Sequence, residues 1–166
     1  YGYTRDFPVE QYWRDNRLNM IHEGTHGIQA MDLLGRKVLM EGGRGLQLLA
    51  GRINATIERA IQVPALAAHA NALGAALQQV GAATKAAWAN AVPYMQAFGH
   101  TVLAWVWLDL ALATLADDAA LAQPASVGRM GSMRYFFHYE LPKIGAWLQV
   151  VSTRDATCAS FPEDAF

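Results

Sequence analysis

Two histidines and a glutamate lie close together near the start of the chain, in the run His22-Glu23-Gly24-Thr25-His26. On an α-helix the two histidines would be one turn apart and could hold a zinc ion, while the glutamate activates a water molecule. The pattern fixes only three positions, so chance matches are common. Gly24 and Thr25 are also typical of a helix entrance and not of a helix interior. We therefore predict no metal site and keep a zinc hydrolase only as an alternative.

Helices must position this run. Asp6 can cap a first helix, because Pro8 follows within the first turn, where its missing N–H costs nothing, and the helix should continue through Arg17. A break is expected around Glu23-Gly24, and Thr25 can then cap a second helix. The apolar residues of this second helix recur at helical spacing: Ile28, Met31, Leu34 and Val38.

The rest of the chain also predicts helices. Gly42-Gly43 ends the N-terminal part, and a third helix follows with an apolar stripe at helical spacing. An alanine-rich helix lies between Pro64 and Asn90, and a further helix starts at Pro93. The third helix's stripe is Leu46, Leu49, Ile53, Ile57 and Ile61.

The last long helix begins near Pro124 and extends to Trp147, with a kink or division at Pro142. No run of residues alternates like a convincing strand. The sequence therefore predicts an all-α fold, in which two short helices lead into an antiparallel bundle of about four helices.

Composition narrows the classes of partner. Hydrophobic residues make up 53% of the chain and charged residues 16%, with a net charge of −1, so we expect a globular protein that does not bind nucleic acid. Residues 86–108 carry no charge but include Asn90, Pro93 and His100, which favours a bundle helix over a membrane span. The single cysteine, Cys158, fits a reducing cytoplasm.

Four blocks near the N-terminus form a longer pattern, comprising residues 1–10 (YGYTRDFPVE), 12–15 (YWRD), 21–29 (IHEGTHGIQ) and 32–37 (DLLGRK). Together, and with this spacing, they resemble the C-terminal domain of the acyl-CoA dehydrogenases. The later segments 90–94 (NAVPY) and 134–137 (RYFF) resemble the C-terminal extension of a larger subgroup that includes the methylthiopropionoyl-CoA dehydrogenases.

The resemblance implies a division of the chain. Residues 1–42 would be the end of the catalytic helical domain, and residues 43–166 a helical-bundle extension. Because the chain opens within the first block, we expect it to be part of a longer enzyme. We also expect the chain by itself to lack FAD and activity.

The resemblance also implies roles. Glu23 would be the catalytic base that removes the α proton of an acyl-CoA thioester, and Gly24 would line the substrate channel. Thr25, His26, Gly27 and Gln29 occupy the positions at which the family contacts FAD. The implied partners are an acyl-CoA substrate, an electron-transfer flavoprotein as electron acceptor, and further copies of the chain in a homo-oligomer.

The chain departs from the family pattern at two positions: His22 stands where tyrosine is usual, and Gln11 where a basic residue is usual. A second hypothesis, from another class, is that the chain is a helical assembly or binding module of the family without catalytic activity.

Overall fold

The structure is a computed structural model that describes residues 4–7, 9–21, 25–117, 121, 123–157, 160, 162 and 164. Of residues 20, 21, 86, 88 and 89 it describes the backbone alone. The His22, Glu23 and Gly24 assignments therefore lie outside the described residues, and so does Cys158.

The described chain is helical and contains no strand, which confirms the predicted all-α fold. A π-helical turn, η1, follows α2, and short 3-10 or π-helical turns join several of the later helices. The elements are α1 Val9–Ile21, α2 Thr25–Asp32, η1 Leu33–Lys37, η2 Met40–Gly43, α3 Arg44–Ile61, α4 Ala67–Ala83, η3 Thr84–Asn90, α5 Ala91–Leu115, α7 Pro124–Tyr135, η4 Phe136–Glu140, η5 Leu141–Lys143 and α8 Ile144–Thr153.

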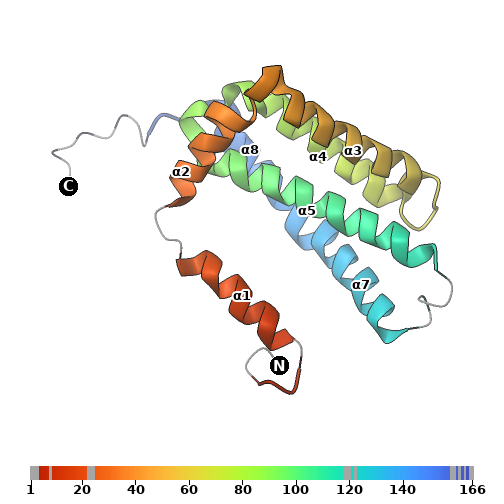
Figure 1. The fold of residues 1–166 in the computed structure, drawn as a ribbon. Coiled ribbons are helices and arrows are strands. Elements are labelled where there is room, and N and C mark those ends of the chain that lie inside the picture. The colour runs from red at the N-terminus through yellow and green to blue at the C-terminus, as the bar shows by residue number, and fades with distance from the viewer. Residues whose placement is uncertain are drawn as a thin grey trace.

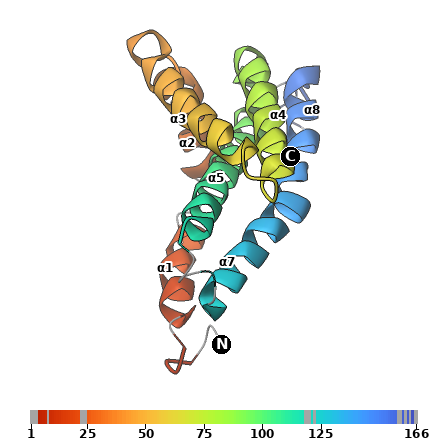
Figure 2. The same ribbon diagram turned by 90° about the vertical axis from the view of Figure 1, so that its right-hand side faces the viewer.

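Four rods form an antiparallel bundle: α3, α4, α5, and the pair α7 and α8 (Figure 1). As the sequence predicted, the last rod is divided at Pro142, which lies in η5 between α7 and α8. The helix α2 packs across α5, whereas α1 extends away from the bundle (Figure 1). Turned by 90°, the molecule shows α3 and α4 diverging from their connecting loop, with α5 beside them (Figure 2).

The central element is α5, which packs against α2, α3, α4, α7 and α8. Its buried residues are mostly small and recur every three or four positions: Ala91, Tyr94, Ala97, Thr101, Ala104, Leu108, Ala111 and Thr114. The facing helix α4 buries a similar series, Ala70, Leu73, Ala76, Val80 and Ala83. Alanine at such positions lets helix axes approach closely, so the bundle packs through an alanine seam.

Among the described residues, α5 is the one helix long and apolar enough to cross a membrane by length and composition. Here it packs against five neighbouring helices, which is the arrangement expected of a central bundle helix.

A cluster of polar contacts around the buried Thr56 hydroxyl joins α3 to α5. Thr56 is 2% exposed, and its Oγ1 accepts a 2.9 Å hydrogen bond from Trp105 Nε1 and donates at 3.3 Å to Asp109 Oδ1. Asp109 also accepts a 2.6 Å bond from Arg59 Nη2. Thr56 therefore satisfies an indole N–H that would otherwise lie in an apolar contact.

The predicted apolar stripe of α3 is buried at Ile53 and half-buried at Leu46, Leu49 and Ile57, but Ile61 is exposed. The buried face instead ends at Ala60, the residue before α3 finishes at Ile61.

Replacing Ala76 with leucine should destabilise the protein by about 1–3 kcal/mol, because three extra carbons would enter a closely packed seam. Ala76 is 2% exposed, whereas the adjacent Ala75 lies on the exposed face of the same helix. Ala75→Leu is thus a matched control, and we expect it to change stability by less than about 0.5 kcal/mol. Chemical denaturation measures both, and equal effects would contradict the seam.

Thr56→Val should cost about 1–3 kcal/mol, because it leaves the Trp105 N–H buried without its acceptor. Thr114→Val is the control, since the Thr114 hydroxyl is also buried but bonds only to the Leu110 carbonyl of its own helix, at 2.8 Å. We expect a smaller loss there. The free energies of unfolding, with Trp105 fluorescence as the local probe, distinguish the two variants.

Candidate functional site

The described part of the predicted site is the first turn of α2. The helix begins at Thr25, which is half-buried. His26, Gly27 and Gln29 follow on the exposed side of the helix. Three of the four residues assigned to cofactor binding are therefore accessible from outside the bundle.

The sequence analysis made Thr25 the capping residue, whereas the structure places it inside the first turn. The helix thus starts one position earlier than expected, which is within the usual uncertainty of a helix boundary. The helix α1 ends at Ile21 and α2 begins at Thr25, and the predicted break around Glu23-Gly24 lies outside the described residues.

Packing against α5 fixes α2. The buried apolar residues of this segment are Ala30 of α2, Leu34 of η1 and Val38 directly after η1, spaced every four positions. The sequence stripe also included Ile28 and Met31, but these are 68% and 46% exposed. The chain then continues into the π-helical turn η1, where the Val38 N–H donates to the Leu33 carbonyl at 2.9 Å.

An ion pair spans the junction between α2 and η1. Arg36 Nε donates to Asp32 Oδ1 at 2.6 Å, and Nη2 donates to Oδ2 at 3.1 Å. This forked contact holds the pKa of the Asp32 carboxyl below its ordinary value. The Arg36 side chain is exposed and the Asp32 side chain is half-buried at the surface, so the pair orients the junction and contributes little to stability.

The first turn of α2 has the properties of an anion-binding position. Helix N-termini offer unpaired N–H groups and the positive end of the helix dipole. A Cβ added at Gly27 would meet nothing within 4 Å, so the backbone there can be approached closely. These features suit a phosphate-bearing cofactor.

The helix α1 presents apolar side chains that the bundle leaves uncovered. Tyr12, Trp13 and Leu18 are 69%, 46% and 56% exposed. Its polar contacts are local: Arg14 bonds to Glu10 at 2.7 Å, and the Arg17 guanidinium lies 5.4 Å from the Trp13 ring centre. Exposed aromatic groups of this size are typical of a surface that packs against another part of a protein.

The zinc alternative has no counterpart among the described histidines and acids, where no three of these groups lie close enough to hold a metal ion. His22 and Glu23 lie outside the described residues, so the structure does not test the motif itself.

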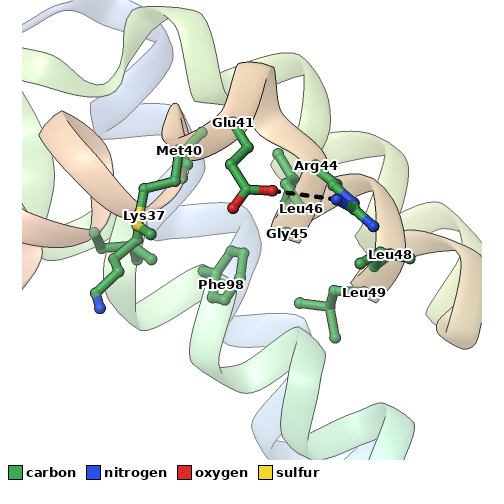
Figure 3. Close-up of a pocket in the computed structure, with 11 residues that line it drawn as sticks. Lys37, Met40, Glu41, Arg44, Gly45, Leu46, Leu48, Leu49 and Phe98 are labelled. Atoms are coloured by element: carbon green, nitrogen blue, oxygen red, sulfur yellow. Dashed lines mark hydrogen bonds and ion pairs between the residues drawn. The ribbon is translucent and has the colours of Figure 1, made fainter.

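A hollow of about 480 Å³ lies on the far side of η1 from this turn, between η1, η2, α3 and α5 (Figure 3). Lys37, Glu41 and Arg44 stand around it, and Phe98 lies at its base. No hollow is predicted at these residues from the sequence alone. Gly42-Gly43 is the sequence feature that marks its rim, because both glycines have positive φ, as does Glu41, and together they turn the chain sharply there.

The chain is similar to several known proteins. Residues 49–162 match the family model described as "Acetyl-CoA dehydrogenase C-terminal like". The 3-methylmercaptopropionyl-CoA dehydrogenase of Ruegeria pomeroyi is 37% identical over 134 residues, which cover 74% of this chain and 22% of that protein. The chain belongs to the acyl-CoA dehydrogenase family. This confirms the resemblance inferred from the sequence blocks.

Two further acyl-CoA dehydrogenases are similar to the chain. A broad-specificity linear acyl-CoA dehydrogenase of Mycobacterium tuberculosis is 28% identical over 187 residues, covering 99% of this chain and 30% of that protein. A short-chain-specific acyl-CoA dehydrogenase of Clostridium acetobutylicum is 44% identical over 36 residues, covering 22% of this chain. The chain thus spans less than a third of the length of the first two relatives.

Replacing Arg36 with glutamine should raise the pKa of Asp32 toward its ordinary value, because the forked hydrogen bond to the carboxylate is lost. The Asp32 contribution to stability is present above the ordinary pKa of aspartate and is lost as the pH falls through the lower pKa of the folded state. NMR titration of labelled aspartate measures the change. Arg44→Gln, which alters a separate pair, should leave the Asp32 pKa unchanged.

Proposed function

We propose that this chain is the C-terminal part of an FAD-dependent acyl-CoA dehydrogenase that forms the α,β double bond of an acyl-CoA thioester, with Glu23 as the base. The observation that carries the proposal is the start of α2. Glu23 lies two residues before the exposed first turn at Thr25, in a family whose named relatives are acyl-CoA dehydrogenases.

Flavin binding to this turn is supported by its chemistry. Thr25, His26, Gly27 and Gln29 would hold part of the cofactor through first-turn N–H groups and polar side chains. When bound, the flavin supplies the hydride acceptor for the β hydrogen. The short turn offers too few contacts to bind FAD alone, so we expect the chain by itself to be colourless and inactive.

Glu23 and Gly24 would act on the thioester. The Glu23 carboxylate accepts the proton from the α carbon, and its backbone N–H donates to the thioester oxygen, where negative charge develops. Gly24 leaves room for the substrate beside them. Proton removal next to a carbonyl requires such a positioned base, which explains a carboxylate at a helix entrance.

The partners follow from the same proposal. The reduced enzyme would pass its electrons to an electron-transfer flavoprotein. The uncovered aromatic residues of α1 support contact with the rest of a longer chain or with a second subunit, since Tyr12 and Trp13 lie apart from the bundle.

A non-catalytic assembly module is the second candidate, and the same exposed face of α1 favours it. The two functions differ in one measurement. The purified full-length protein should show a flavin absorption spectrum that bleaches when an acyl-CoA is added without oxygen, whereas an assembly module would show none.

Glu23→Gln in the full-length protein should leave the flavin bound and lower turnover by about 10²–10⁴-fold or more, because the amide keeps the size of the side chain but cannot accept the proton. Glu58→Gln, on the exposed side of α3, is the matched control and should retain full turnover. Stopped-flow flavin reduction measures the step directly. Retention of more than about a tenth of wild-type turnover would remove Glu23 from this role.

A further inference from the structure

Two adjoining hollows lie where α3 and α4 diverge beside α5 (Figure 2). The outer one is the 480 Å³ hollow at η2, and the inner one, of about 280 Å³, lies between α3, α4 and α5. Leu46, Leu49 and Phe98 line both. The two hollows therefore adjoin at these three side chains, and the pair is called the groove, with the outer hollow as its mouth and the other as its inner end.

The inner end presents hydrocarbon. Ile53, Leu77 and Val102 line it, and its hydroxyl groups bond within the protein. Thr84 Oγ1 donates to the Val80 carbonyl at 2.9 Å, and Thr101 Oγ1 donates to its own helix at 2.9 Å. Gln47 is the one other polar residue of the lining, and the remaining residues are apolar or glycine, so the inner end suits an apolar chain.

Glycines keep the groove open. Gly45 in α3 lines the outer hollow and Gly81 in α4 lines the inner one, and a Cβ at either would meet nothing within 4 Å. A helix is less stable with glycine than with alanine at an interior position, and no close packing requires glycine at these two positions. The open space beside Gly81 is part of the inner hollow.

Two basic residues and one acidic residue line the mouth, and Figure 3 shows the Glu41 carboxylate turned toward the hollow. In Figure 3, Phe98 lies between Lys37 and Arg44, which stand on either side of the outer hollow. Arg44 has one acidic contact, Glu41 at 3.5 Å, and both side chains are about 70% exposed. Such a long, exposed pair is weak, so the guanidinium can accept a better-placed anion. Two cations against one carboxylate favour a negatively charged head group.

We propose that this groove binds an amphipathic anion with a single linear apolar tail, of the fatty-carboxylate class. The tail lies along Leu49 and Phe98 into the inner hollow, toward Gly81. The carboxylate pairs with Arg44 at the mouth, with Lys37 on the other side. The site is independent of the role given to Glu23.

The probe is decanoate, titrated by calorimetry into the full-length protein, with decanol as the uncharged comparison. We expect decanoate to bind more tightly than decanol. Affinity should rise by up to about fourfold for each methylene from hexanoate to decanoate, the gain expected for burying one methylene, and level off once the inner hollow is filled.

Substitutions at the mouth test the head group. Arg44→Gln should weaken decanoate binding about three- to fivefold, the effect expected for one exposed ion pair. Glu41→Gln should strengthen it, because it removes the competing carboxylate. Arg52→Gln, on the exposed surface of the same helix, is the matched control and should have no effect. Decanol binding should be unchanged in all three.

Substitution at the inner end tests the tail. Gly81→Leu should lower decanoate affinity more than tenfold by filling the hollow. Gly81→Ala, which favours the helix, should produce a smaller loss and covers the case that leucine disturbs folding. Gly51→Leu is the control, since Gly51 lies outside the groove and its added Cβ also meets nothing within 4 Å.

Three results would overturn the proposal. The first is no decanoate binding, and the second is decanoate binding that Gly81→Leu leaves unchanged. The third is equal affinity for decanoate and decanol together with unchanged decanoate binding in Arg44→Gln. The first would mean that the groove is closed, as by another segment of the longer protein. Glu23→Gln should bind decanoate like wild type. Loss of turnover in that variant thus tests the dehydrogenase function separately from the groove.

Discussion

Close packing of small side chains around α5 is the constraint on which the bundle depends. The alanines of α4 and α5 bring backbones together, so each helix is held by contact along its length and not by a few large anchors. Such a seam tolerates little added volume. Tyr94 is buried within this seam, whereas Trp105 is half-buried and donates its indole N–H to Thr56.

The position of α2 follows from this seam. Ala30 and Leu34 seat α2 on α5, and the π-helical turn η1 then directs the chain toward η2. The first turn of α2 is therefore exposed beside a rigid helix, which is a suitable place to present backbone donors to a bound group. The ion pair of Asp32 with Arg36 lies at the other end of α2, where it orients the junction with η1 without adding much stability.

The elements differ in how much apolar surface they leave exposed. The helix α1 exposes Tyr12 and Trp13, and α2 exposes Ile28, whereas the helices of the bundle bury a continuous core. The chain spans less than a third of its first two relatives, so the proposed reaction would draw on parts of a longer protein. The bundle contributes a stable base for α2, and its groove between α3 and α4 adds a separate binding surface.

The sequence by itself determined the helical class, the division at Pro142 and the family, because these depend on local signals: periodicity, proline and a run of motif residues. Tertiary structure alone decided which apolar residues are buried. Ile28, Met31 and Ile61 fit the helical stripe but remain exposed, since burial depends on the neighbour that each face meets. The groove is likewise absent from the pattern. Leu49, Gly81 and Phe98 are distant in sequence and meet only because α3 and α4 diverge beside α5.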